Sequence, residues 1–371
     1  MTDSTALTPR SIAVVFGTRP EVVKLADVVH VLGDAARTVH SGQHFSPALA
    51  RDFLDELGLD AAHVQLEIGG ASRGRQVGEA TAALDDHFAA APPRVVVVQG
   101  DTNTALAGAL AADARSIPLV HIEAGLRSFD RAMPEEHNRV VVDHLADLLC
   151  APTETSRGNL AAEGIAGDRV IVTGNTVVDA VARLLPAAGE RAALLEQHGL
   201  EPGRYVLSTF HRPENVDDRA VLATILDQLV ALPVPVLFPL HPRTAARAER
   251  FGLADRLAAL RVVEPLGYRA FLGLSAECAL LVTDSGGIQE EASVLKRPVV
   301  VVRNSTERPE VLGTFAELVL PGPGIGARVT ERLADLEAVH ARLASIASPY
   351  GDGRAAVRSA DAIRSLVEVT A

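Results

Sequence analysis

The sequence predicts an α/β protein built from two doubly wound, Rossmann-like domains, each with a parallel β-sheet. The first observation is a repeated alternation of short apolar strands with longer helix-forming segments along the chain. The second is that the strands read as continuous apolar runs, such as residues 95–98, which is typical of parallel strands buried on both faces. The third is that polar residues gather directly after the strands. At 371 residues, the chain is long enough for two domains of ordinary size.

Composition limits the classes of function that we expect. The chain carries 47 acidic and 35 basic residues, a net charge of −12, which argues against nucleic-acid binding. No apolar run approaches the roughly 18 residues of a membrane-spanning helix, and residues 1–10 lack a signal-peptide core. We therefore expect no membrane partner and a cytoplasmic location. Cys150 and Cys278 lack metal-type spacing, so we expect buried free thiols and no metal site.

The first domain is expected over residues 1–175, closed by a C-terminal helix at about residues 351–371. Apolar runs predict strands at residues 11–16, 37–40, 95–99, 118–122, 148–151 and 170–172. Helices are predicted from Pro20 and Pro134, since proline suits a first helical position, and over residues 47–57, 73–89 and 105–115.

The second domain is expected over residues 176–350 and repeats the alternation after a helical stretch at 176–198. Its strands are predicted at residues 205–209, 235–239, 261–263, 279–282 and 298–302. Its helices are predicted at residues 219–231, 244–259, 268–274 and 287–295.

Ligands of open α/β sheets bind beyond the carboxyl ends of the strands. In the first domain the polar residues in such positions are Arg19, His44, Asp101, Glu123 and, at the start of the next helix, Glu135. In the second domain they are His211, His241 and the segments 284–291 and 304–310. Any one of these residues taken alone would more often be structural. Together, two domains with opposed strand ends predict a cleft suited to a nucleotide sugar.

One stretch, Asp284-Ser285-Gly286-Gly287, joins an apolar strand to a helix. Glycines without a Cβ let a diphosphate approach the backbone at a helix N-terminus. Glu291 follows about one turn later, where its carboxylate could accept hydrogen bonds from ribose hydroxyls. An ordinary helix cap made by Asp284 or Ser285 is the alternative that this stretch leaves open.

A series of short motifs over about residues 11–315 resembles the bacterial non-hydrolysing UDP-N-acetylglucosamine 2-epimerases, in order and in spacing. The motifs are Gly17-Thr18-Arg19-Pro20-Glu21, Gly42-Gln43-His44, Gly100-Asp101-Thr102, Glu123-Ala124-Gly125-Leu126-Arg127, Pro134-Glu135-Glu136-His137-Asn138-Arg139, Pro152-Thr153-Glu154, Thr173-Gly174-Asn175-Thr176, His211-Arg212, Asp284–Glu291 and Thr306-Glu307-Arg308-Pro309-Glu310. The resemblance implies a glycosyltransferase-B-like pair of domains facing across a cleft, a homodimer, and neither metal nor other cofactor. It implies UDP-GlcNAc, UDP-ManNAc and UDP as ligands, and a place in cell-surface polysaccharide or antibiotic sugar biosynthesis.

The resemblance also assigns roles to single residues. It implies catalytic roles for Asp101, Glu123, Glu135 and His211. It implies substrate or UDP binding by Arg19, Lys24, Arg139, Phe271, Ser285, Gly286, Gly287, Glu291 and Arg308, with Phe271 against the uracil. A second, activating UDP-GlcNAc of some members would lie against Gln43, His44, Arg75, Gln76, Glu136, Arg212 and His241. Ser46 stands where those members carry a glutamine, so we expect activation to be weak or absent.

The reaction that the resemblance implies begins with elimination, because the hydrogen on C2 of the sugar is not acidic. UDP leaves to give 2-acetamidoglucal and then adds back, with protonation on the opposite face of C2. This route needs an acid, a base and a cationic site for the leaving diphosphate. Three alternatives stay open: a hydrolysing epimerase that releases ManNAc and UDP, a retaining glycosyltransferase, and a nucleotide-sugar-binding protein that has lost catalysis.

Overall fold

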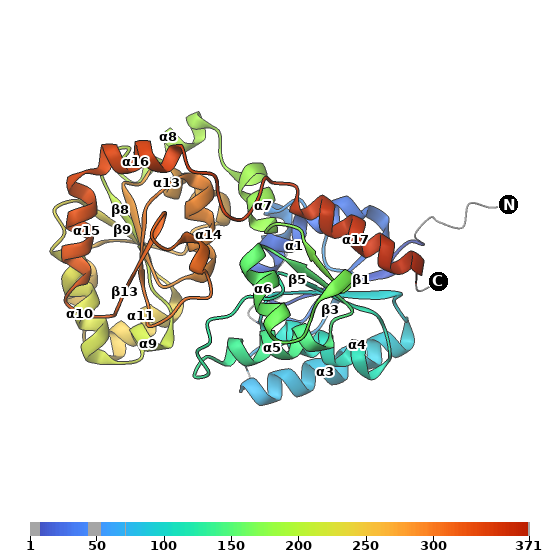
Figure 1. The fold of residues 1–371 in the computed structure, drawn as a ribbon. Coiled ribbons are helices and arrows are strands. Elements are labelled where there is room, and N and C mark those ends of the chain that lie inside the picture. The colour runs from blue at the N-terminus through green and yellow to red at the C-terminus, as the bar shows by residue number, and fades with distance from the viewer. Residues whose placement is uncertain (1–7, 44–52, 71, 370–371) are drawn as a thin grey trace. The chain divides into compact units, whose positions relative to one another are not determined.

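The computed structural model describes residues 8–43, 53–70 and 72–369 (Figure 1). It divides into two compact units, one formed by Met1–Ala182 with Tyr350–Ala371 and the other by Arg183–Pro349. Each unit contains one parallel sheet covered by helices. We describe each unit by itself.

The first unit has a seven-stranded sheet in the order β3-β2-β1-β4-β5-β6-β7, with every pair parallel. Its strands are β1 (Ile12–Phe16), β2 (Ala36–His40), β3 (Val64–Gln65), β4 (Val95–Gln99), β5 (Leu119–Ile122), β6 (Leu148–Ala151) and β7 (Val170–Val172). The strand order reverses between β1 and β4. Such a reversal leaves a crevice at the carboxyl ends of the two strands, where ligands of doubly wound sheets bind.

Helices cover both faces of this sheet (Figure 1). They are α1 (Arg19–Leu32), α3 (Arg73–Ala90), α4 (Asn103–Ala114), α5 (Pro134–Leu145), α6 (Glu154–Ala162), α7 (Thr176–Leu184) and α17 (Ala355–Val369). α1 packs with α17, and α4 packs between α3 and α5. α4 lies close to the sheet because its inner face is built from alanines and Gly108, where an added Cβ would lie 2.8 Å from Val98.

The second unit repeats the topology with a six-stranded parallel sheet in the order β10-β9-β8-β11-β12-β13. Its strands are β8 (Val206–Thr209), β9 (Val236–Pro239), β10 (Arg261–Val263), β11 (Leu280–Thr283), β12 (Val299–Val302) and β13 (Ala316–Val319). Its helices are α8 (Ala188–Gln197), α9 (Pro213–Val216), α10 (Arg219–Val230), α11 (Pro242–Arg250), α12 (Ala254–Ala258), α13 (Tyr268–Glu277), α14 (Gly286–Leu295), α15 (Ile325–Ala334) and α16 (Leu336–Ala344). The strand order reverses between β8 and β11, which sets a second switch point there.

The structure differs from the sequence prediction mainly at sheet edges and helix breaks. The strands β3 and β13 and the helices α6, α9, α15 and α16 were not predicted; both strands lie at sheet edges. The expected helix at 176–198 is two helices separated at Pro186, and the expected helix at 244–259 breaks at Gly252, which has a positive φ of 68°. The expected helix at 47–57 lies largely outside the described residues.

The boundary between the units falls inside α7 rather than before Thr176, where the sequence analysis placed it. Val177 and Val181 of α7 are buried. The Asp179 carboxylate accepts hydrogen bonds from the backbone N–H groups of Ala355 and Ala356, at 3.2 and 3.1 Å. Asp179 thereby caps the N-terminus of α17, so α7 holds the closing helix on the first unit.

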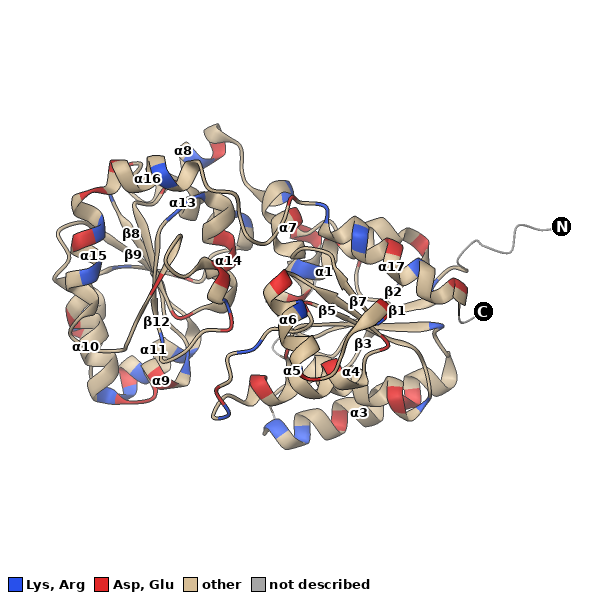
Figure 2. Ribbon diagram, in the orientation of Figure 1, with Lys and Arg blue, Asp and Glu red and all other residues tan. Residues whose placement is uncertain are grey.

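Charged residues lie mainly on helices and loops, while the strands are nearly free of them (Figure 2). Cys150 and Cys278 are free and buried, as predicted, and burial raises the pKa of each thiol to about 12. Neither thiol is therefore ionised at neutral pH. Within the described ranges, no helix combines the length and the apolar character that crossing a bilayer requires.

Candidate active site

The turns that follow β4 and β5 present two acidic side chains at the switch point of the first unit. Gly100 and Gly125 turn the chain with positive φ values of 68° and 82°. Glu123 itself has a φ of 69°, which is uncommon for a residue with a Cβ. A non-glycine residue in this conformation is held there by its surroundings, and the contacts of Glu123 show how.

Glu123 is buried and engaged through both carboxylate oxygens. Oε1 pairs with the ammonium of Lys24 on α1 and accepts a hydrogen bond from Asn175 Nδ2 at 3.0 Å. Oε2 accepts a hydrogen bond from the amide of Gln99 at the end of β4. The sequence analysis expected Glu123 and Lys24 in the site but missed Gln99 and Asn175. Both are polar residues at strand ends, so the rule that found Asp101 would also have found them.

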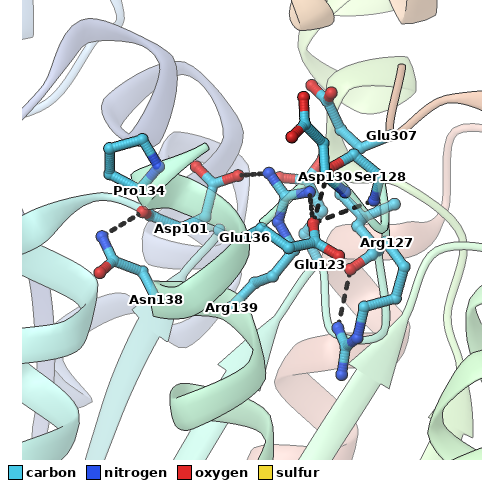
Figure 3. A network of polar contacts seen from close by, with 12 residues as sticks. Asp101, Glu123, Arg127, Ser128, Asp130, Pro134, Glu136, Asn138, Arg139 and Glu307 are labelled. Carbon is cyan, nitrogen blue, oxygen red and sulfur yellow. Dashed lines mark hydrogen bonds and ion pairs between the residues drawn. The ribbon is translucent and has the colours of Figure 1, made fainter. Parts of the chain in front are cut away.

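Asp101 is held by a different cation, Arg139 of α5 (Figure 3). Arg139 Nη2 donates to Asp101 Oδ2 at 2.5 Å, and its Nη1 donates to Glu136 Oε2 at 2.7 Å. Asn138 Nδ2 donates to the backbone carbonyl of Asp101 at 2.8 Å. The Asp101 side chain is 29% exposed although Arg139 is 2% exposed. The Asp101 carboxylate is therefore accessible to solvent, while the buried guanidinium of Arg139 fixes its position.

Glu136, in the first turn of α5, binds the loop that precedes this helix. Its carboxylate accepts hydrogen bonds from the Ser128 N–H at 3.0 Å, the Ser128 hydroxyl at 2.8 Å and the Phe129 N–H at 2.8 Å. With the ion pair to Arg139, these contacts account for its burial. Glu136 was expected in a second nucleotide site, whereas here its oxygens face this loop and α5.

Glu135 lies in the first turn of α5 and is partly exposed. In the part of the chain that the structure describes, no hydrogen bond or ion pair engages its carboxylate. The three expected carboxylates of the sugar site therefore differ: Glu123 is buried and paired, Asp101 is paired and partly exposed, and Glu135 has no such partner among the described residues.

Glu21 is a further carboxylate at this switch point, and the sequence analysis gave it no role. Oε2 accepts hydrogen bonds from the N–H groups of Gly17 and Thr18 at 3.1 and 2.8 Å and from the Thr18 hydroxyl at 2.8 Å. Oε1 accepts one from the Thr102 hydroxyl at 2.7 Å. Burial raises the pKa of Glu21 to about 7, and these hydrogen bonds offset the rise only in part. The Glu21 side chain thus links the turn after β1 to the turn after β4 through hydrogen bonds.

In the second unit, His211 and Asp284 meet across the switch point between β8 and β11. His211 Nδ1 lies 3.0 Å from Asp284 Oδ1. The same carboxylate accepts hydrogen bonds from the N–H groups of His211 and Arg212 and from Asn215 Nδ2. Burial alone would raise the pKa of Asp284, but the His211 charge and these hydrogen bonds hold it below its usual value. The His211 side chain is 38% exposed, so the ring stays accessible while Asp284 orients it.

The turn from β11 into α14 separates the roles of its two glycines. A Cβ on Gly286 would lie 2.4 Å from Glu307 Oε1, whereas a Cβ on Gly287 would meet nothing within 4 Å. We expected both glycines to admit a diphosphate, and the structure distinguishes them: Gly286 lies against the Glu307 side chain, whereas Gly287 faces open space. Ser285 is the N-cap of α14, but its side chain makes no capping hydrogen bond. The alternative of an ordinary side-chain cap therefore does not describe this turn.

Two further residues expected at the nucleotide lie on neighbouring helices. Glu291 of α14 is nearly buried and its Oε1 accepts a hydrogen bond from the Tyr268 hydroxyl at 3.0 Å. Phe271, on α13 with Tyr268, is partly buried.

Arg308 lies in a buried ionic network rather than on an open surface. Its Nε pairs with Glu290, which is fully buried, and its Nη1 lies 3.6 Å from Glu307. Arg303 Nη1 lies 2.8 Å from Glu307, and Arg212 Nη2 lies 3.8 Å from the same carboxylate. The sequence analysis expected Arg308 at the nucleotide and missed Arg303, Glu290 and Glu307 as its neighbours.

A family model described as UDP-N-acetylglucosamine 2-epimerase matches residues 32–364. The chain belongs to this family. A crystal structure of the Methanocaldococcus jannaschii UDP-GlcNAc 2-epimerase in complex with UDP-GlcNAc and UDP is 37% identical, with a TM-score of 0.84 over 96% of this chain and 99% of that one. The Neisseria meningitidis UDP-GlcNAc 2-epimerase bound to UDP-GlcNAc is 31% identical, with a TM-score of 0.86 and the same coverage.

A relative from Pseudomonas aeruginosa carries the name of a different epimerase. It is the UDP-2,3-diacetamido-2,3-dideoxy-D-glucuronate 2-epimerase, 35% identical over 83% of this chain and 88% of its own length. The epimerase family and the fold of two Rossmann-like domains, as in glycosyltransferase-B-like proteins, are thus confirmed, and similar chains in the family differ in the sugar that their names give.

The residues that match the activator site of some epimerases lie in both units. Gln43 Oε1 accepts hydrogen bonds from the Thr104 N–H and hydroxyl, at 3.0 and 2.8 Å, and Gln76 Oε1 accepts one from Asn103 at 2.8 Å. These two amides therefore gather at the N-terminus of α4. The others are exposed Arg75 and buried Glu136 in the first unit, and Arg212 and His241 in the second. His44 and Ser46 lie outside the described residues.

The remaining expected residue is Arg19 at the start of α1. Its side chain is exposed, and its guanidinium lies 5.3 Å from the centre of the Phe53 ring. Across the described ranges, no three His, Cys, Asp or Glu side chains are grouped as a metal site.

Proposed function

We propose that this protein is a non-hydrolysing UDP-N-acetylglucosamine 2-epimerase, an isomerase that interconverts UDP-GlcNAc and UDP-ManNAc. The observation that carries the proposal is the set of carboxylates at the strand ends of the first unit, in which Asp101, Glu123 and Glu135 have three different environments. The family match and the nucleotide-sugar complexes of similar proteins support the substrate class.

The chemistry explains why acid–base groups are needed. No carbonyl activates C2, so the C2–H bond breaks only as the C1–O bond to UDP breaks. The electron pair of the C2–H bond then forms a C1=C2 double bond, and UDP departs with the electron pair of the C1–O bond. Re-addition reverses these steps, with the proton delivered to the other face of C2. Because the two faces differ, one group takes the proton and another returns it.

The different environments of the three carboxylates suggest that they have different roles in the reaction. Glu135 and Asp101 are partly exposed, and we propose that these two exchange protons with C2. Glu123 pairs with Lys24 and accepts hydrogen bonds from Gln99 and Asn175, so we propose that it acts as a carboxylate whose negative charge favours the positive character that develops at C1 as UDP leaves.

The second unit supplies groups suited to the nucleotide. We propose that His211, oriented by Asp284, donates to the diphosphate, and that the diphosphate approaches the α14 N-terminus at Gly287. Glu291 would accept from the ribose hydroxyls and Phe271 would pack against the uracil, both as the family resemblance implies. Arg308 would then act through the buried network that shapes this turn.

Product analysis tests the proposal. We expect ³¹P and ¹H NMR to show UDP-GlcNAc converting to UDP-ManNAc with its diphosphate intact. Free ManNAc and UDP would instead identify a hydrolysing epimerase. UDP-2,3-diacetamido-2,3-dideoxy-D-glucuronate is assayed in parallel, because turnover of that compound alone would reassign the substrate. Asp101→Asn and Glu135→Gln should each lose most turnover, whereas Asp85→Asn should retain it, since Asp85 lies on α3 and pairs with Arg115 at 2.6 Å.

A further inference from the structure

His121, on β5, is fully buried and both of its ring nitrogens meet acceptors. Nδ1 lies 2.6 Å from Asp143 Oδ1, and Nε2 lies 2.8 Å from the backbone carbonyl of Gly100. A carbonyl oxygen only accepts, so Nε2 carries a hydrogen. The charge on the ring then depends on which partner holds the proton between Nδ1 and Asp143.

Two donors besides His121 point to Asp143 as the acceptor. Arg127 Nη1 donates to Asp143 Oδ2 at 2.6 Å, and the Gly125 N–H donates to both carboxylate oxygens at 3.1 and 3.3 Å. Burial would raise the pKa of Asp143, but the charges and hydrogen bonds of His121 and Arg127 lower it below its usual value. The ion pair with the Arg127 guanidinium independently favours the ionised form of Asp143, which leaves a hydrogen on Nδ1 of His121 as well as on Nε2.

The neighbouring charges balance this buried cation. Arg127 pairs side-on with Glu163, with both Nε···Oε1 and Nη2···Oε2 at 2.7 Å. Glu163 in turn lies 3.4 Å from His144 at the end of α5. His121 and Arg127 thus face Asp143 and Glu163, two positive groups against two negative ones. Charge neutrality is what lets such a group persist without solvent.

The backbone atoms that this pair binds belong to the two turns that present the acidic residues of the site. His121 holds the Gly100 carbonyl, immediately before Asp101, and Asp143 holds the Gly125 N–H, shortly after Glu123. We propose that His121 is a permanently charged positioning residue, which with Asp143 locks these two turns together and so sets the placement of Asp101 and Glu123. Its effect on catalysis rests on the proposed function; its charge state does not.

A second buried histidine of the same sheet gives a matched comparison. His40 Nδ1, at the end of β2, accepts a hydrogen bond from the Gly42 N–H at 2.9 Å, so that nitrogen carries no hydrogen. Burial lowers the pKa of His40 to about 4. At neutral pH we thus expect His121 to be positively charged and His40 to be neutral, although both rings are buried.

The charge state is tested by NMR of the whole protein labelled with ¹⁵N in its twelve histidines. At pH 8.5, about two units above the ordinary histidine pKa, we expect an imidazolium signal with a hydrogen on each nitrogen. It should be absent from His121→Gln, while the neutral ring of His40 remains in both proteins. The proposal is overturned if no imidazolium signal persists at pH 8.5, or if that signal survives in the variant. A wild-type spectrum without any imidazolium signal at pH 8.5 overturns the proposal even if His121→Gln does not fold.

Kinetics then test the positioning role. Because His121 touches backbone rather than substrate, we expect His121→Gln and Asp143→Asn to lower kcat about 10- to 100-fold while KM and UDP affinity stay within about threefold. Unchanged kcat in a folded variant would refute the positioning role. If the wild-type protein turned over no sugar nucleotide, the proposed function would fail, but the NMR result would still decide the charge state.

Discussion

Arg139 donates to Asp101 at 2.5 Å from a position that is almost fully buried, and the same guanidinium donates to Glu136 at 2.7 Å. One planar cation thereby fixes both a carboxylate of the site and the loop that leads into α5. Arg139 can bind two separate carboxylates because its guanidinium presents several N–H donors in a rigid plane. The ammonium group of a lysine lacks this planar arrangement of donors.

Replacing Arg139 with lysine should therefore reduce turnover without removing the charge. We expect Arg139→Lys to lower kcat at least about 10-fold, because Asp101 loses its fixed orientation. We also expect the free energy of unfolding to fall by about 1.5–3 kcal/mol, since an ammonium cannot replace the charge-assisted hydrogen bonds to both carboxylates. Steady-state kinetics and urea denaturation measure both effects. Arg115→Lys is the control, because Arg115 pairs with Asp85 near the surface; equal behaviour of the two variants would contradict this account.

The buried pair of Lys24 and Glu123 gives a second prediction. Lys24→Met should lower the free energy of unfolding by about 3–5 kcal/mol, because Glu123 is left buried without its cation. Adding Glu123→Gln should restore most of that loss but not the turnover. Urea denaturation of the two single variants and the double variant measures the coupling. A single variant as stable as the wild type would show that Glu123 does not depend on Lys24.

Glu21 makes stability depend on pH in a defined direction. Its pKa is raised from 4.5 to about 7 in the folded protein, so the folded state binds this proton more tightly than the unfolded state. The resulting stability is fully present below about pH 4.5 and is lost as the pH rises through 7, a change of about 3 kcal/mol. Glu21→Gln keeps an oxygen for Gly17 and Thr18 and an amide for Thr102, but does not titrate.

Urea denaturation at pH 5 and pH 8 compares the two proteins directly. The wild type should lose about 2.5 kcal/mol more than Glu21→Gln between these pH values, since part of the full change lies below pH 5. Equal losses would mean that the Glu21 carboxylate titrates in the folded protein as it does in the unfolded chain.

The two glycines of the turn before α14 should respond differently to a methyl group. Gly287→Ala faces open space, so we expect unchanged or slightly higher stability, by about 0.5–1 kcal/mol, and UDP binding weakened at least about 10-fold. Gly286→Ala should instead destabilise the protein by about 1–3 kcal/mol, because its Cβ would meet Glu307 at 2.4 Å. Calorimetry with UDP measures the affinities. Gly78→Ala on α3, also with open space, controls for the helix effect; unaltered UDP affinity in Gly287→Ala would remove this turn from the nucleotide site.

The sequence predicted most of the fold because parallel strands are continuous apolar runs, as in residues 95–98 of β4. It failed for the edge strands β3 and β13, because Gln65 and Glu317 interrupt their apolar runs. Asp101 and Glu123 could be predicted as site residues because ligands bind at the carboxyl ends of parallel strands, and those ends are visible in the sequence once the strands are found.

The choice of ionic partners could not be predicted, because it depends on packing between distant segments. Arg308 pairs with Glu290 of α14, and nothing in the local sequence distinguishes it from an arginine free to bind a nucleotide. Gly286 and Gly287 look equivalent in sequence, and only the approach of Glu307 separates them. The high pKa of Glu21 likewise follows from burial, which the motif Gly17-Thr18-Arg19-Pro20-Glu21 does not reveal.

The central claim is that epimerisation proceeds by elimination and re-addition of UDP, with Asp101 and Glu135 exchanging protons with C2. The most direct measurement is incubation with UDP-GlcNAc in deuterated water followed by NMR at C2. We predict deuterium at C2 of UDP-ManNAc and, after repeated turnover, at C2 of the recovered UDP-GlcNAc. Formation of UDP-ManNAc that keeps its original hydrogen at C2 would contradict the account.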